Sequence, residues 1–117
     1  MDKFSALADP TRRKIIEMLA SRGQLSATEI SGAFDVSAPA ISQHLKILRE
    51  AELVQVEKRG QQRIYQINPH SMLELASWVQ QVTNLWNQRY DALEELLEAE
   101  KKKAISEKSI SDQSISK

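Results

Sequence analysis

The sequence predicts an α+β fold in one domain, with short helices first, a β-hairpin next and a long helix at the end. Three observations predict it. Apolar residues recur at helical spacing up to about residue 51, two short runs rich in β-branched and aromatic residues follow, and a seven-residue apolar period begins after residue 69. A chain of 117 residues is long enough for one compact domain and too short for two ordinary ones.

The composition excludes several classes of protein. Lys plus Arg and Asp plus Glu number 16 each, so the formal net charge is zero and a uniformly basic nucleic-acid binder is excluded. Without cysteine, the chain has no disulfide, thiolate metal site or cysteine nucleophile. No apolar run approaches the roughly 20 residues that span a bilayer, and the amino end lacks the apolar stretch of a secretory signal. We expect a soluble, cytoplasmic protein.

Two helices are expected before residue 24. Asp9 and Pro10 open the clearer one, because Asp accepts hydrogen bonds from free helix-start amides and Pro fits the first helical position. Apolar residues recur after them at helical spacing, and Gly23 suits the end of the helix. A shorter helix over residues 4–8 precedes it.

The next two helices are separated by a tight connection at residues 35–37. Ser26 and Glu29 have the spacing of a capping box, which predicts a brief helix after them. Ser37 caps the following helix, residues 38–51, which carries an apolar stripe along one face. Two short helices joined in this way form a helix-turn-helix by pattern.

A β-hairpin follows directly. Residues 53–57 and 63–67 are short and rich in β-branched or aromatic residues, and the basic segment 58–62 separates them. A hairpin with a basic tip behind a helix-turn-helix predicts a winged helix-turn-helix.

A long helix is expected from about residue 70 to about residue 100. Two seven-residue series run along it, and all their residues except Arg89 are apolar: Met72, Val79, Trp86 and Leu93, and Leu75, Val82, Arg89 and Leu96. A helix of about thirty residues would be about 45 Å long, which is more than the hairpin and short helices can cover. A second copy of the chain is therefore expected to cover the rest.

Residues 101–117 form a basic tail. After three lysines comes the near-repeat ISEKS-ISDQS-ISK, whose period matches neither helix nor strand and whose isolated Ile residues cannot form a core. We predict that this tail is disordered. The three lysines either contact DNA phosphates or, more in keeping with charge runs in general, are solvated.

Residues 37–67 and 8–19 resemble the ArsR/SmtB family of bacterial winged-helix repressors. The most specific parts are Ser-x-Pro-x-Ile-Ser-x-His-Leu at residues 37–45 and Asp-Pro-Thr-Arg at residues 9–12. The resemblance covers about residues 3–100. It implies a homodimer packed through the first and last helices, the helix from Ala38 in the major groove of DNA, and the hairpin against the flanking backbone.

The resemblance has one notable departure. Relatives more often have Gly at the position of Glu52, where the chain leaves the helix in a left-handed turn, and such a turn costs a non-Gly residue about 1 kcal/mol. Residues 1–100 are accordingly predicted to be a DNA-binding and dimerisation domain. Repression, rather than activation, follows from the family alone.

The outward arc of the helix at residues 38–51 suits base reading. Gln pairs with adenine, Lys favours guanine, and small residues let the backbone approach. The base-reading candidates are Ala40, Ser42, Gln43 and Lys46. An ordinary solvated face is the alternative.

Phosphate contacts are expected from basic and polar residues around that arc. Basic side chains in a first helical turn oppose the helix dipole, so local stability does not explain them, and the hairpin tip suits backbone contact. The candidates are Arg12, Arg13, Ser37, Lys58, Arg59 and Arg63. The expected dimer-interface residues are Phe4, Leu7, Val79, Val82, Trp86, Tyr90 and Leu93.

Neither a metal nor another cofactor is expected. His44 lies beside the core stripe of its helix, as a hydrogen-bonded structural histidine would. His70 and Glu74 have helical spacing, but a coordination shell needs three or four ligands. Metal sensors of the family commonly have cysteines at the positions of Ser26 and Thr28.

The sequence predicts a sequence-specific transcriptional repressor that binds a two-fold DNA operator as a homodimer. An enzyme is not expected, because the two histidines are distant and the three glycines are isolated, so no phosphate-cradling loop exists. The alternative is a winged-helix protein-protein interaction module without specific DNA binding, which the zero net charge favours.

Overall fold

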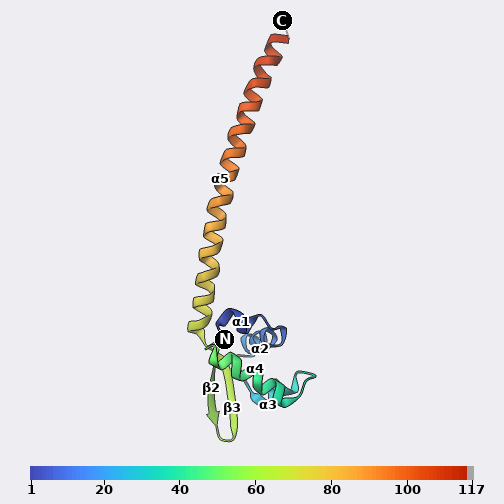
Figure 1. Cartoon of the computed structure of the whole chain (residues 1–117), viewed down its shortest axis with the longest axis vertical. Helices are drawn as coiled ribbons and strands as arrows, with labels where there is room; N and C mark the ends of the chain where they lie inside the picture. Colours follow the sequence, from blue (N-terminus) through green and yellow to red (C-terminus); the bar gives the residue numbers. More distant parts are fainter. Residues whose placement is uncertain (116–117) are drawn as a thin grey trace. The chain divides into compact units, whose positions relative to one another are not determined.

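The computed structural model describes the backbone of residues 1–115 and the side chains of residues 1–106. The elements follow the order α1, α2, β1, α3, α4, β2, β3 and α5 (Figure 1). The chain divides into two compact units, of which the first is Met1–Ala76 and the second begins at Ser77. The first unit contains every element except most of α5, so the α+β winged arrangement predicted from the sequence is confirmed there.

Side-chain caps fix the ends of the first two helices. In α1 (Lys3–Leu7), Asp2 accepts a hydrogen bond from the Ser5 amide at 2.8 Å. In α2 (Pro10–Arg22), Asp9 accepts from the Arg12 amide at 3.0 Å. Gly23 follows with φ of 88°, a left-handed conformation that glycine adopts without steric strain. The predicted helix between Asp9 and Gly23 is confirmed.

A short strand, β1 (Gln24–Ser26), precedes α3 (Ala27–Gly32). Ser26 and Glu29 form the predicted capping box, with amide-to-side-chain hydrogen bonds of 3.1 and 3.0 Å. The sequence analysis did not predict β1. Three residues are too few to show an alternating pattern, and the strand exists because it pairs with a segment some forty residues later.

Helix α4 (Ala38–Glu50) begins at Ser37, whose hydroxyl oxygen accepts a hydrogen bond from the Ala40 amide at 3.3 Å. Ile41, Leu45 and Leu48 form its buried face. They pack in one core with residues from α1, α2, α3 and the sheet. The other buried apolar residues of this core are Ala6, Ile15, Leu19, Leu25, Ile30, Ala51, Leu53, Val54 and Tyr65.

A left-handed residue ends α4, as the family resemblance implied. Glu52 has φ of 61°, its amide donates to the Arg49 carbonyl at 2.9 Å, and the Leu53 amide donates to the Leu48 carbonyl at 3.0 Å. These two hydrogen bonds define a Schellman motif, and Leu48 and Leu53 are fully buried beside it. The chain thus turns sharply from α4 into the sheet.

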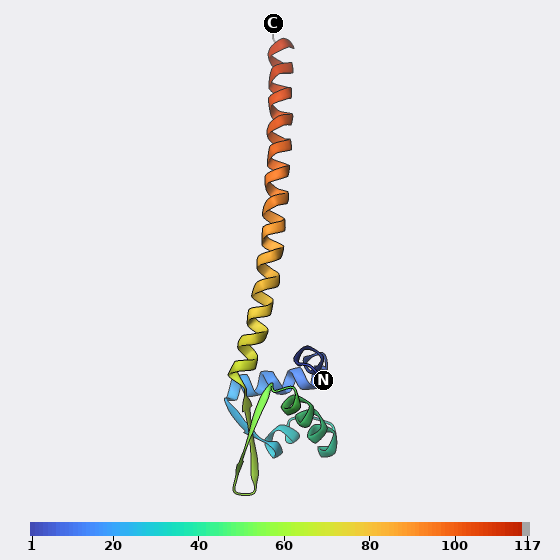
Figure 2. The same ribbon diagram turned by 60° about the vertical axis from the view of Figure 1, so that its left-hand side comes forward.

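Strands β2 (Val54–Arg59) and β3 (Gln62–Ile67) form the predicted hairpin. Among the described residues the sheet has three antiparallel strands in the order β1-β3-β2, so β3 lies in the centre. Tyr65 of β3 pairs with Leu25 on one side and Val56 on the other. The tip of the hairpin projects beyond the helices of the first unit, as Figures 1 and 2 show from two directions.

The start of α5 (Pro69–Ile115) is tied to the end of α4. The Asn68 carboxamide oxygen accepts from the His70 amide at 3.2 Å, which caps the helix. The Asn68 amide group donates to the Glu52 carbonyl at 2.9 Å, and the Ser71 hydroxyl donates to the same oxygen. One backbone carbonyl therefore joins the α4 terminus to the first turn of α5.

Helix α5 is longer than the sequence analysis predicted. Its expected end was near residue 100, but the helix continues to Ile115, and this differs from the disorder predicted for residues 101–117. Residues 116 and 117 lie outside the described part. No Gly or Pro follows Pro69, and residues 98–104 are strong helix formers with Glu98 four residues before Lys102. Within the described residues, no helix combines the length and the apolar character that crossing a membrane requires.

Candidate nucleic-acid interface

The outward face of α4 is polar and exposed. Ser42, Gln43 and Lys46 are exposed and Ala40 is half-buried, so all four predicted base-reading residues lie on one accessible arc opposite the buried stripe. The small side chains of Ala40 and Ser42 leave room for another backbone to approach. The arc presents both a neutral hydrogen-bonding side chain and a cation.

A groove of about 500 Å³ lies between α4 and the hairpin. Its polar lining comes from Ser42, Gln43, Lys46 and Arg49 of α4 and Arg63 of β3. Tyr65, Leu45, Pro39 and Ala27 complete the wall. Helix α4 and strand β3 therefore contribute three cationic side chains to one concave surface: Lys46, Arg49 and Arg63.

Arg49 is a candidate that the sequence analysis missed. It is exposed, and with residues 1–106 it forms neither a hydrogen bond nor an ion pair through its side chain. Ser42, Lys46 and Arg49 are spaced by four and three residues, so the same helical projection that selected the first two could have found the third. An unpaired guanidinium in a groove is available to an external anion.

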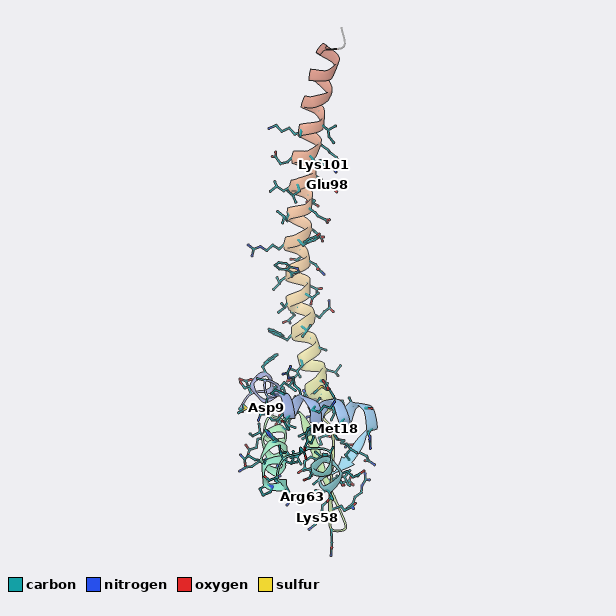
Figure 3. All side chains as sticks on the ribbon, turned by 90° about the vertical axis from the view of Figure 1, so that its right-hand side faces the viewer. Asp9, Met18, Lys58, Arg63, Glu98 and Lys101 are labelled. Atoms are coloured by element: carbon teal, nitrogen blue, oxygen red, sulfur yellow. The ribbon has the colours of Figure 1, made fainter. Side chains whose placement is uncertain are left out.

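Like charges face each other on the hairpin. Lys58 of β2 is paired with Arg63 of β3 in the strand register, and Figure 3 labels both. Like charges directly opposite each other destabilise a sheet, so hairpin stability does not account for this pair. Arg59, the next residue, bonds to Glu57 at 3.1 Å and to Gln24 at 3.2 Å. An external polyanion would be attracted by the unpaired cations.

Ser37 and Arg13 are also exposed. Ser37 uses its hydroxyl oxygen as the cap of α4 and retains a hydroxyl proton to donate. Arg13 lies in the first turn of α2, and with residues 1–106 its side chain forms no hydrogen bond or ion pair. Both remain candidates for phosphate contact.

Arg12 differs from its neighbour and corrects the sequence analysis. It is only 8% exposed, and its guanidinium donates inward, to the Ala6 carbonyl at 2.6 Å and the Ser5 carbonyl at 3.4 Å. The position of a side chain on an isolated helix does not reveal that another helix covers it. A guanidinium that is buried and bonded inward is not placed for the predicted phosphate contact.

His44 is the hydrogen-bonded structural histidine that the sequence predicted. Its Nδ1 atom lies 3.2 Å from a terminal nitrogen of Arg12 and 3.9 Å from the Asp9 carboxylate. The pKa of Asp9 is lowered, first by the hydrogen bond from the Arg12 amide and further by the positive charge of the Arg12 guanidinium. This cluster holds α2 and α4 together.

His70 and Glu74 form the predicted pair, with Nε2 and Oε1 3.0 Å apart. Lys3 of α1 bonds the other oxygen of Glu74 at 2.9 Å, and this hydrogen bond is the main cause of the lowered pKa of Glu74. Glu74 thus has two partners already. In the described part of the chain, no group of three or more His, Cys, Asp or Glu side chains could hold a metal ion.

The expected dimer-interface residues belong to α1 and α5. On α1, Phe4 is half exposed and Leu7 packs partly against the core. On α5, the exposed fractions are 53% for Val79, 44% for Val82, 65% for Trp86, 53% for Tyr90 and 51% for Leu93. A large exposed aromatic side chain among aliphatic ones is typical of a surface that another chain covers.

Comparison with known proteins identifies relatives that are similar to this chain. A family model described as bacterial regulatory protein, arsR family, matches residues 9–56, which contain α2, β1, α3, α4 and the start of β2. The Transcriptional repressor SdpR of Bacillus subtilis is 38% identical over 76 residues, covering 65% of this chain and 83% of that protein. The HTH-type transcriptional regulator Rv2034 of Mycobacterium tuberculosis is 37% identical over 97 residues, covering 83% and 87%.

A solved structure is also similar to this chain. The ArsR-like Transcriptional Regulator from Rhodococcus sp. RHA1 superposes with a TM-score of 0.70 at 29% identity, over 82% of this chain and 87% of that one. The similarity extends over most of both chains.

Proposed function

Because the chain belongs to the ArsR family of bacterial regulatory proteins, we propose that it is a transcriptional repressor that binds a two-fold DNA operator as a homodimer. The observation that carries the proposal is the groove between α4 and β3, where Lys46, Arg49 and Arg63 converge beside Gln43. Bound at a promoter, the protein would exclude RNA polymerase.

In this proposal α4 lies in the major groove of DNA. Gln43 and Lys46 read base edges, since both side chains are exposed and carry the donors and acceptors that adenine and guanine bind. Ala40 and Ser42 allow the helix to approach closely. The phosphate contacts come from Arg13, Ser37, Arg49, Lys58, Arg59 and Arg63, which fix the register without reading sequence. This local set of cations makes a net charge of zero compatible with DNA binding.

A homodimer would supply two copies of this surface to a two-fold site. The exposed apolar residues of α5, together with Phe4 and Leu7 of α1, are proposed as its interface. Residues 1–100 would then be a DNA-binding and dimerisation domain, located in the cytoplasm where the operator is.

We further propose that neither metal nor other cofactor takes part. The absence of cysteine from the sequence supports this, and so does the pairing of Glu74 with both His70 and Lys3.

Fluorescence anisotropy with the full-length protein tests the proposal. One labelled duplex carries the promoter upstream of the protein's own gene and another has random sequence. Binding to both should weaken steeply as salt rises, because neutralised phosphates release counterions, and the promoter duplex should bind more tightly. No binding at low salt, or no preference for any promoter sequence, would favour the protein-protein interaction module instead.

A further inference from the structure

The guanidinium of Arg12 lies where α1, α2 and α4 meet. The residue belongs to the first turn of α2 and is 8% exposed. Its Nε atom donates to the Ala6 carbonyl of α1 at 2.6 Å, and Nη2 donates to the Ser5 carbonyl at 3.4 Å. Its Nη1 atom lies 3.2 Å from Nδ1 of His44 in α4. The Arg12 side chain therefore forms hydrogen bonds to both α1 and α4.

The contact with His44 fixes the state of the imidazole. Arginine has only donors, so Nδ1 of His44 must accept, and the ring proton of the neutral histidine must be on Nε2. Asp9 lies 3.9 Å from the same Nδ1 atom while it caps α2 through the Arg12 amide. The ring of His44 is therefore held against α2 by a directional hydrogen bond as well as by packing.

Helix α1 is attached to the first unit by apolar packing, with Leu7 partly buried against the core, and by polar contacts. Of its five residues, Ala6 is the buried one, and Lys3 forms an ion pair with Glu74. The two Arg12 bonds to consecutive carbonyls are directional, so they fix the register of α1 against α2 in a way that apolar packing does not. A lysine could not reproduce them, because its single ammonium group lacks the planar fork of guanidinium.

We propose that Arg12 is a positioning residue for DNA recognition, which couples α1 to the recognition helix α4 through His44. The inference rests on the proposed function, in which α1 contributes to the dimer interface and α4 reads the operator. Arg12 sets the orientation of each α4 relative to the dimer and does not itself contact DNA.

Operator affinity measured at several salt concentrations tests the proposal, with full-length Arg12→Lys, His44→Leu and His44→Asn. Asn offers an oxygen near the position of Nδ1, whereas Leu removes the acceptor. Arg12→Lys and His44→Leu should each weaken operator binding about tenfold at an unchanged salt slope, and the double variant should lose little more than either alone. His44→Asn should bind within a few-fold of the parent.

Arg49→Ala is the control variant for the salt slope. It removes a guanidinium that the proposed function places on a phosphate, so its salt slope should fall by about 0.9 per lost contact. A comparable fall in slope for Arg12→Lys would mean that Arg12 contacts phosphate, which overturns the proposal. Parental affinity in a folded His44→Leu variant would overturn it equally.

A second measurement needs no DNA and remains available if Arg12→Lys folds poorly. Nitrogen-15 NMR of the neutral imidazoles distinguishes the two tautomers, and the chain has only two histidines, of which exposed His70 serves as the internal reference. His44 should be in the Nε2-H form in the parent, and a mixture of tautomers there would refute the contact. Failure of the parent to bind any duplex would instead refute the proposed function and leave this result standing.

Discussion

Glu52 has the left-handed backbone that glycine normally occupies at the end of a helix. Its φ of 61° is required by the two hydrogen bonds of the Schellman motif, and its own carbonyl accepts from Asn68 and Ser71. The backbone of Glu52 is therefore held by hydrogen bonds to Arg49, Asn68 and Ser71 whatever the side chain is. The side chain of Glu52 is exposed and contributes no hydrogen bond among the described residues.

Glu52→Gly should stabilise the protein by about 1 kcal/mol, because glycine removes the steric penalty of the left-handed conformation. Urea unfolding followed by circular dichroism measures this change. Glu50→Gly, at the last residue of α4, is the control and should destabilise the protein, because glycine is a poor helix former and the ion pair of Glu50 with Lys46 is lost. A loss of stability in Glu52→Gly would show that the turn is not strained.

Gln43 and Arg63 should differ in the kind of effect that their removal has. Gln43→Ala should lose about 1 to 3 kcal/mol on the operator and little on random duplex, since it removes a base contact. Arg63→Ala should weaken both and flatten the salt slope by about 0.9 per lost phosphate contact. In a homodimer both copies carry the substitution, so the change in binding free energy is about double that of a single contact. The assignment of recognition helix and wing would be reversed if Arg63→Ala alone changed the ratio of specific to random affinity.

The caps of α2, α3 and α4 determine where each of these helices begins. Asp9, Ser26 and Ser37 each accept a hydrogen bond from a backbone amide of the first turn. Of these three acceptors only the Asp9 carboxylate titrates, although the Glu29 carboxylate that completes the capping box of α3 also has a lowered pKa, caused first by the hydrogen bond from the Ser26 amide. The cap of α2 therefore contributes a stability that depends on pH, whereas the Ser37 cap of α4 does not titrate.

Folding stability should fall in acid partly through Asp9. Its pKa is lowered below the ordinary value of 3.8 in the folded chain, so its contribution to stability is complete above that value and is lost as pH falls through the lower, folded pKa. Asp9→Asn keeps a capping oxygen but does not titrate. Thermal unfolding should show that the parent loses more stability than Asp9→Asn between about pH 5 and about pH 3. Equal losses would show that the cap contributes no pH dependence.

The exposed apolar residues of α5 lead to a prediction about assembly. Trp86→Ala should shift the protein toward monomer, because removing a large aromatic side chain from an interface typically costs about 3 to 5 kcal/mol. Sedimentation equilibrium measures the shift, and Gln88→Ala, an exposed polar residue two positions later, should leave the dimer intact. A monomeric parent, or an unchanged dimer in a chain that ends before residue 84, would contradict the prediction.

For the whole molecule, we expect DNA binding to be insensitive to divalent metals. Titrating zinc, nickel or cadmium into the complex with the operator should leave anisotropy unchanged at micromolar metal, because the described residues hold no group of three or more His, Cys, Asp or Glu side chains. Release by metal in the parent but not in His70→Ala would establish a metal-responsive site at the His70 and Glu74 pair.

The sequence predicted most of the winged fold because its signals are local. Caps such as Asp9 and Ser37 act within three residues, and the change of apolar period at residue 53 marks the hairpin. Strand β1 and the burial of Arg12 depend on partners distant in the sequence, so neither could be read from a local pattern. Helix α5 continues past its predicted end because the segment after residue 100 contains no helix-breaking residue, although the repeat there has no helical period.

The facing cations of the hairpin have a consequence for the free protein. Lys58 and Arg63 repel each other across the two strands as long as no counter-charge is near, so the tip of the wing is held together against its own electrostatics. A strand of phosphates passing beside them reverses the sign of that local energy. Contact with a polyanion would therefore stabilise the pairing of the two strands at the tip in addition to binding the hairpin.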